Sequence, residues 1–371
     1  MKTNFTFKPQ HFIVALLLIT FTACKKDKQN PTQVNPTGKY QDGFYIINEG
    51  WYQHAAGSIG FFSYTKGAIV DSAFSTENPG KFFNPNTSQL ESGTIFKGKL
   101  YLLTKYGGPL VVADAMSLKE TGRIAAAPTN DFRAFLGIDD TKGLVSTSDG
   151  IYPINLSTLA LGIKISTVSG EVGDMIKAGN YIFVLSADKG LVILNAADYT
   201  VAKTIANLSV GFAVTPDGSV WVAGDTSLDK INPSNLNVTT VTTPFTVNNT
   251  WGAWHPGSIT ASTKENTVFL ANNEQYNGGT TIYKYTDGNA ASINTAFITI
   301  APGKDLQSKE LYGKGIAYNA TTNQLVVNTV ESGFGTHFTV NDLDFYDPSS
   351  GALIKDIPFT GYYFPAIVVF H

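Results

Sequence analysis

The chain has 371 residues, a formal net charge of −3, only 15% charged residues and 35 glycines. This composition is typical of many short strands joined by tight turns and argues against a mainly helical protein. The sequence holds no block of basic residues, so we do not expect nucleic acid as a partner. A single cysteine, Cys24, excludes an intrachain disulfide.

The N-terminal residues have the pattern of an export leader. Lys2 and Lys8 precede an apolar stretch, residues 12–23, that is too short to span a bilayer. The stretch ends in Phe-Thr-Ala-Cys, which resembles a lipobox, although Phe21 stands where leucine is usual. We therefore predict a lipoprotein signal peptide over residues 1–23 and lipidation of Cys24. The alternative is an ordinary secretory leader followed by a chance cysteine.

The residues after Cys24 predict a tether. Lys25-Lys26-Asp27-Lys28 resembles the charged surface-export tags of Bacteroidetes lipoproteins, and residues 29–40 are polar and proline-rich. Such a segment cannot form a core. We expect residues 24–42 to be the lipidated cysteine and a flexible tether. The expected location is the cell envelope, as an outer-membrane lipoprotein exposed at the surface, with the lipid anchor as its only membrane contact.

An internal repeat covers the rest of the chain. Residues 100–124 and 181–205 align without a gap as three short strands, with an Asx residue opening the second turn. Five more copies follow the same plan, at residues 44–74, 144–165, 220–241, 268–300 and 325–357. The residues that open these turns are Asp114, Asn155, Asn195, Asn232 and Asp347.

A further short apolar stretch precedes each copy except the first. Each of these stretches has a glycine near its start, as expected for strands crowded around a central channel: Gly93, Gly137, Gly173, Gly211, Gly257 and Gly315. The stretch missing before the first copy is supplied by residues 363–371. We therefore predict an all-β fold for residues 43–371, a seven-bladed β-propeller of four-stranded blades closed by the C-terminal strand in blade 1. An open β-sandwich pair is the alternative.

Loop lengths indicate where a ligand would bind. Copies three and five span 22 residues, and two and four span 25, whereas six, seven and one span 33, 33 and 31. The extra length falls on neighbouring blades and carries many aromatic and amide side chains. The candidate ligand-binding residues are Trp51, Tyr52, His54, Trp251, Trp254, His255, Tyr276, Phe334, His337 and Tyr362. Aromatic faces beside polar edges suit a large, partly planar, polar ligand such as a sugar or a corrinoid. The alternative is that these loops pack on one another.

Enzyme motifs are absent from the sequence, which has no HExxH, GxSxG or Walker pattern. His54, His255 and His337 lie too far apart to give a zinc spacing, and Glu49 and Glu331 as paired carboxylates have no predictable separation. We predict no catalytic residue, no metal and no cofactor.

Three short motifs carry a family resemblance. Asn48-Glu49-Gly50, residues 215–224 (TPDGSVWVAG) and Phe364-Pro365-Ala366 resemble the YncE-like surface-layer propellers, in particular Bacteroidetes lipoproteins of that fold. The resemblance implies a non-enzymatic surface protein that binds a ligand. Some relatives capture corrinoids for a TonB-dependent transporter in the outer membrane.

Three functions are therefore open. The first is capture of a small-molecule or glycan ligand, with a corrinoid foremost, for such a transporter. The second is a protein-docking or adhesion propeller. The third is an enzyme, such as a quinoprotein-like oxidoreductase or a polysaccharide lyase, which would need clustered acids or a metal in the channel mouth.

Overall fold

The computed structural model describes residues 1–2, 38–83, 89–125, 131–247, 257–272, 279–303, 308–332 and 337–371. The chain divides into two units, Met1–Pro36 and Thr37–His371, and all described sheets lie in the second. No helix in these ranges is long and apolar enough to cross a membrane.

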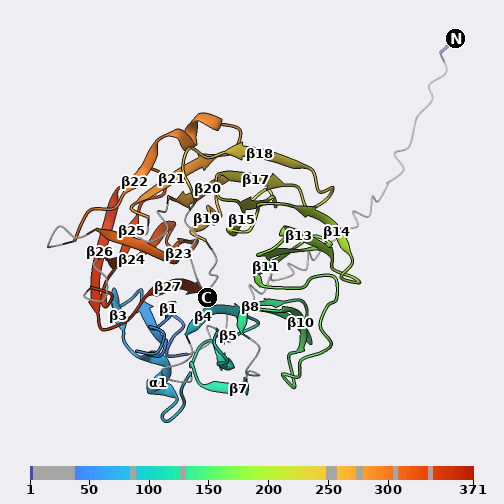
Figure 1. Ribbon diagram of the computed structural model, residues 1–371. Helices are drawn as coiled ribbons and strands as arrows, with labels where there is room; N and C mark the ends of the chain where they lie inside the picture. The colour runs from blue at the N-terminus through green and yellow to red at the C-terminus, as the bar shows by residue number, and fades with distance from the viewer. Residues whose placement is uncertain are drawn as a thin grey trace. The chain divides into compact units, whose positions relative to one another are not determined.

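Seven antiparallel sheets are arranged as blades around a centre (Figure 1). From the inner to the outer strand, blade 1 has β27 (Pro365–Phe370), β1 (Gly43–Asn48), β2 (Ser58–Ser63) and β3 (Ala68–Val70); blade 2 has β4 (Leu90–Phe96), β5 (Lys99–Thr104), β6 (Leu110–Asp114) and β7 (Glu120–Ile124); blade 3 has β8 (Phe132–Gly137), β9 (Lys142–Thr147) and β10 (Gly150–Asn155). Blade 4 has β11 (Val172–Ala178), β12 (Tyr181–Ser186), β13 (Gly190–Asn195) and β14 (Val201–Ile205); blade 5 has β15 (Gly211–Val214), β16 (Val220–Ala223), β17 (Ser227–Ile231) and β18 (Val238–Thr242). Blade 6 has β19 (Ile259–Ala261), β20 (Thr267–Ala271), β21 (Thr281–Thr286) and β22 (Ala296–Thr299); blade 7 has β23 (Lys309–Asn319), β24 (Gln324–Glu331), β25 (Val340–Tyr346) and β26 (Leu353–Thr360). Two short helices, α1 (Ala73–Glu77) and η1 (Ala290–Asn294), lie in connections.

The outer edge of blade 3 is irregular. Residues 161–165 take the fourth position there through the bridge between Ile154 and Leu161 and the hydrogen bond from Ile165 N–H to Ile151 O. Pro153 in β10 has no N–H to donate, which is consistent with a broken ladder at this edge.

The C-terminal strand closes the ring, as predicted. β27 pairs with β1 in antiparallel register, with Phe44 opposite Phe370 and Ile47 opposite Ile367. The two ends of the propeller therefore lie in one sheet, and the seven-bladed fold expected from the repeat is confirmed.

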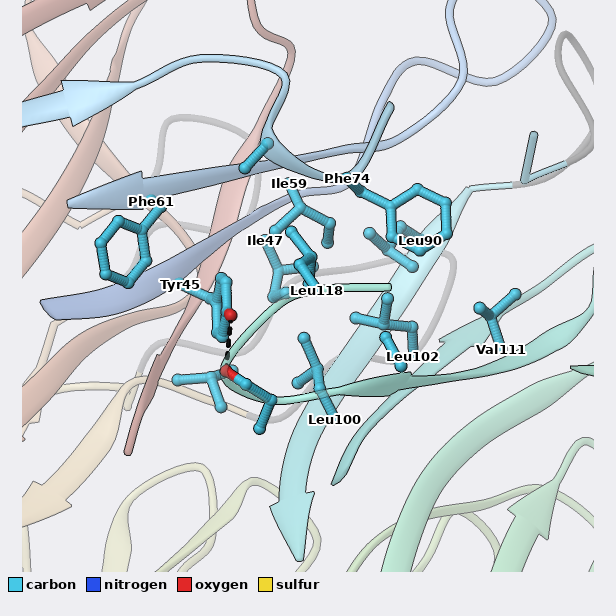
Figure 2. Close-up of a cluster of buried hydrophobic side chains, with 14 of the residues drawn as sticks. Tyr45, Ile47, Ile59, Phe61, Phe74, Leu90, Leu100, Leu102, Val111 and Leu118 are labelled. Carbon is cyan, nitrogen blue, oxygen red and sulfur yellow. Dashed lines mark hydrogen bonds between the residues drawn. The ribbon is translucent and has the colours of Figure 1, made fainter. Parts of the chain in front are cut away.

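The core consists of apolar layers between adjacent blades. Successive strand residues point to opposite faces, so a strand in the middle of a blade contributes to two layers. In β12, Ile182 and Val184 pack towards blade 3, while Phe183 and Leu185 pack towards blade 5. Figure 2 shows the layer between blades 1 and 2, where the Tyr45 hydroxyl donates a 2.7 Å hydrogen bond to Ala115 O.

Four of the five predicted Asx residues accept backbone hydrogen bonds in their turns as expected, and the fifth, Asn195, donates from Nδ2 to Thr200 Oγ1. Asp114 Oδ1 accepts hydrogen bonds from the N–H groups of Met116 and Ser117, and Asp347 Oδ1 accepts them from Ser349 and Ser350. The fourth residue after the Asx takes a left-handed conformation in each copy, namely Leu118, Leu159, Tyr199, Leu236 and Gly351. The repeated side chain thus sets a repeated backbone turn.

The inner-strand glycines lie where adjacent blades approach closely. A Cβ atom on Gly137 would lie 2.4 Å from the Phe96 ring of blade 2, and one on Gly211 would lie 2.6 Å from Ile259 of blade 6. The predicted crowding is therefore confirmed at these positions, and its cause is the neighbouring blade.

The folded unit begins before residue 43. Tyr40 is 1% exposed and packs against Tyr45 and Phe61, while its N–H donates to Met116 O and its hydroxyl to Glu77. The end of the expected tether, from residue 38, is thus fixed to blades 1 and 2.

The two ends of the strands define two faces. We call the end that holds the Asx turns the turn face, and the opposite end, where Asn48 leads into the loop 49–57, the mouth face. Tyr40 and the C-terminal His371 belong to the turn face, because Tyr40 binds the turn after Asp114 and Phe370 pairs with Phe44.

Candidate functional site

The structure describes half of the predicted ligand-binding residues. Trp51, Tyr52, His54, His337 and Tyr362 lie in the described ranges, all on the mouth face. Trp251, Trp254, His255, Tyr276, Phe334 and the lipidation residue Cys24 lie outside the described residues.

Trp51 is the centre of an aromatic cluster. Its ring stacks on His54 with centroids 3.8 Å apart, and it contacts Phe338 at 5.5 Å and Tyr363 at 5.4 Å. The loop is tight, since the Trp51 carbonyl accepts from the N–H groups of His54 and Ala55. Blade 1, blade 7 and the crossing between them therefore meet through aromatic rings.

Tyr52 pairs with a tyrosine that loop length does not point to. Its ring centroid lies 4.5 Å from that of Tyr106 in the loop between β5 and β6, at an interplanar angle of 34°. The two residues are 40% and 43% exposed. We call this pair the tyrosine platform.

His337 and Tyr362 make other contacts. His337 Nδ1 lies 3.2 Å from Glu331 Oε2. The Tyr362 ring lies near Phe359, and its hydroxyl is 3.4 Å from Ser72 Oγ, while its carbonyl accepts from Asn341 Nδ2. The adjacent Phe338 and Tyr363 are the residues that contact Trp51.

A chain of charged side chains runs along the mouth ends of blades 1 to 4. Lys105 Nζ lies 2.6 Å from Glu49 Oε1 and 3.1 Å from Glu91 Oε2, and all three side chains are 1% exposed. Arg133 continues the chain: its Nη1 is 3.8 Å from Glu91, and its Nη2 is 2.8 Å from Glu171 and 3.6 Å from Asp131. We call these six residues the rim network.

The carboxylates of the rim network stabilise the charged form of Lys105. Burial alone lowers the pKa of Lys105, but Glu49 and Glu91 outweigh this effect and leave the pKa above its ordinary value. Tyr312 in β23 stacks on Phe364 and hydrogen-bonds to Glu49; burial and the Glu49 charge raise the pKa of its hydroxyl well above normal. Lys105 is therefore charged, and the neighbouring Tyr312 hydroxyl is neutral.

Two further charged residues, Asp174 and Lys314, lie in the inner strands. Burial raises the pKa of Asp174 in β11, and Lys314 in β23 partly offsets this rise. β11 and β23 belong to blades 4 and 7, so the two charges influence each other between blades that are not neighbours.

The sequence carries a signal for the rim network that loop length does not capture. Glu91 and Arg133 are second residues of the inner strands β4 and β8, and Glu171 directly precedes β11. A charged residue at the start of an inner strand, where the other residues are apolar or small, therefore indicates a position in the rim network. Tyr106 lies in a short loop, so loop length gives no reason to select it.

The described residues hold no group of three or more histidine, cysteine, aspartate or glutamate side chains placed to bind a metal. A polar hollow of about 350 Å³ lies on blade 5, lined by Asp217, Ser219, Lys230, Asn232, Pro233, Asn237 and Thr239. It includes the Asx turn at Asn232, so it lies at the turn face, away from the tyrosine platform.

Comparison with solved structures shows the fold. The chain is similar to dihydro-heme d1 dehydrogenase NirN in complex with DHE, with a TM-score of 0.54 and 10% identity over 86% of this chain and 74% of that one. It is also similar to a chain of the mitotic checkpoint complex, with a TM-score of 0.54 and 11% identity over 84% and 93% of the two chains. No curated protein matches the chain. Residues 42–371 match the model of the family described as "Domain of unknown function (DUF5074)", and the chain belongs to this family.

Proposed function

We propose that the chain is a non-catalytic, lipid-anchored envelope protein that captures a ligand at its mouth face and passes it to a TonB-dependent outer-membrane transporter. The observation that carries this proposal is the tyrosine platform, two exposed rings in tilted contact beside a buried ionic rim. Exposed large rings lose the free energy of burial unless something covers them, about 1.5–3 kcal/mol for a fully buried side chain.

The attachment of the N-terminal segment supports a mouth that is open to a partner. The chain enters the propeller at the turn face, where Lys39 pairs with Glu77 at 2.5 Å and Tyr40 is buried. Residues 24–37 reach at most about 50 Å when extended. A lipid on Cys24 would therefore be joined to the propeller at the turn face, and the platform lies on the opposite face.

A corrinoid is the first ligand to test, because its macrocycle offers a broad face and its amides offer polar edges. Residues 30–371 form a suitable soluble protein, since the ring closes on itself through β27 and β1. Mixed with cyanocobalamin and passed through a sizing column, this protein should carry visible absorbance with it. Tyr52→Ala should reduce that absorbance, and Ile163→Ala, at a residue that is 92% exposed on blade 3, should not.

Absorbance that stays entirely in the small-molecule fraction would remove the corrinoid. If the Tyr52→Ala protein carries as much absorbance as the parent, the ligand binds somewhere other than the tyrosine platform. The alternative function, protein docking or adhesion, predicts that no small ligand responds to the platform substitution.

A further inference from the structure

The tyrosine platform consists of two rings in tilted contact. Their centroids lie 4.5 Å apart at an interplanar angle of 34°, and the two residues remain 40% and 43% exposed. A cage of several aromatic faces would suit a cationic head group. A pair of rings in contact instead offers a ligand the outer side of a ring, which suits a flat ligand with C–H groups on one side.

Hydrogen-bond acceptors lie directly beside this surface. Gly107, the residue after Tyr106, donates its N–H to Asp131 Oδ1 at 3.2 Å. The side chains of Asp131 and Glu171 are 23% and 33% exposed, so solvent and ligand groups reach them. Arg133 lies between them and fixes both carboxylates, at 3.6 Å and 2.8 Å.

The charge of the rim network selects among ligands. Four carboxylates, of Glu49, Glu91, Asp131 and Glu171, face the two cations of Lys105 and Arg133. The excess of negative charge disfavours an anionic ligand. Ionised carboxylates only accept hydrogen bonds, so they favour a ligand rich in O–H donors.

Arg133 is more deeply buried than the two carboxylates that it holds. Its side chain is 8% exposed, yet its Nε and Nη1 make no hydrogen bond to any described residue. These donors are buried, so Arg133 holds Asp131 and Glu171 in place, and the two partly exposed carboxylates are the groups that a ligand reaches.

We propose that the tyrosine platform and the Asp131–Arg133–Glu171 group form a subsite for a neutral saccharide. One sugar ring stacks on the outer side of the platform, and its hydroxyl groups donate to Asp131 and Glu171. This inference rests on the proposed capture function and names the ligand class of the same site.

The test measures binding of residues 30–371 to four probes by calorimetry. Maltohexaose, xylohexaose and chitohexaose are neutral, and hexagalacturonate is the anionic counterpart. We expect at least one neutral oligosaccharide to bind and hexagalacturonate to bind more weakly.

Tyr106→Ala should weaken binding of the neutral ligand about three- to tenfold, the effect that corresponds to one aromatic stacking contact. Tyr106→Phe should keep the affinity, Glu171→Gln should reduce it, and Ile163→Ala should leave it unchanged.

Two results would overturn the inference. One is binding of no neutral oligosaccharide, and the other is unchanged affinity in both Tyr106→Ala and Glu171→Gln. Cyanocobalamin in the same assay separates the two proposals, because a corrinoid that binds while every saccharide fails refutes the saccharide subsite and leaves ligand capture standing. Failure of the saccharides and of cyanocobalamin together counts against both.

Discussion

Asp344 in β25 is buried in a cluster of acidic side chains, and its charge should make stability depend on pH. The residue is 3% exposed, and its Oδ1 makes no hydrogen bond to a described residue, while the Tyr346 hydroxyl donates to Oδ2 at 3.2 Å. Burial and then the charge of Asp356 raise the pKa of Asp344 to about 7. Lys309 lies between Asp342 and Asp356, at 3.1 Å and 3.5 Å, and compensates only part of this charge.

The direction of the pH dependence follows from the pKa of Asp344 in the folded and unfolded states. In the unfolded chain the Asp344 carboxyl has its ordinary pKa of 3.8, so the folded state binds the proton more tightly. The stability this proton contributes is fully present below about pH 4 and is lost as the pH rises to 7. A shift of about 3 units corresponds to about 4 kcal/mol, an upper bound because the three aspartates titrate together.

Asp344→Asn keeps the shape of the side chain and removes the charge. We expect the variant to be about 2–4 kcal/mol more stable than the parent at pH 8, with a gain that shrinks steadily between pH 7 and pH 4. Urea unfolding of residues 30–371 across this range measures the difference. Asp347→Asn is the matched control on the same blade, because Asp347 is only half-buried and hydrogen bonds from Ser350 and Ser349 lower the pKa of its carboxyl. A gain for Asp344→Asn that does not vary with pH would refute the argument.

Three further substitutions or deletions test the rim and the ring. Lys105→Met should lower the free energy of unfolding by about 3–5 kcal/mol, because two buried carboxylates lose their cation, and urea titration would show it. Gly137→Ala should cost about 1–3 kcal/mol through contact with the Phe96 ring, whereas Gly162→Ala, with its nearest atom at 3.5 Å, should cost less than half as much. Deleting residues 363–371 should expose the inner edge of β1 and leave aggregated or unfolded protein on a sizing column; a truncated protein that melts normally would contradict closure by β27.

Much of the fold could be predicted because its determinants are local and repeated. An Asx side chain and the backbone turn it opens lie within four residues, so Asp114, Asn155 and Asp347 mark the same turn in three blades. The closing strand was predictable for a different reason. Seven copies with six inner strands leave one position empty, and only the terminal stretch fills it.

The candidate site was less predictable because its contacts join distant parts of the chain. Glu49 meets Lys105, and Lys105 meets Glu91, across two blades, and no spacing along the sequence indicates which acid will pair with which base. Loop length favoured the blades with the most inserted residues. Tyr106 instead comes from a short loop of blade 2 and reaches Tyr52 because adjacent blades bring their mouth ends together.

The backbone at Tyr106 argues that its exposed ring is retained for binding. Its φ is 55°, a left-handed conformation that costs a residue other than glycine about 1–3 kcal/mol. Leu118 and Leu236 share this conformation, but they stand in the Asx turns that recur in five blades. Tyr106 stands instead in the turn that the Gly108 N–H closes on Lys105 O, and its neighbours Lys105 and Gly107 are held by the buried ion pairs and by Asp131. Tyr106→Gly should therefore leave stability equal or higher, by at most about 1 kcal/mol, since relief of strain offsets the lost stacking. Tyr52→Ala loses the same stacking without relief and should be less stable, while both variants should bind ligand more weakly. Urea unfolding measures the stability of the two variants, and calorimetry measures their affinity for the ligand. A large loss of stability in Tyr106→Gly would mean that the Tyr106 ring stabilises the fold.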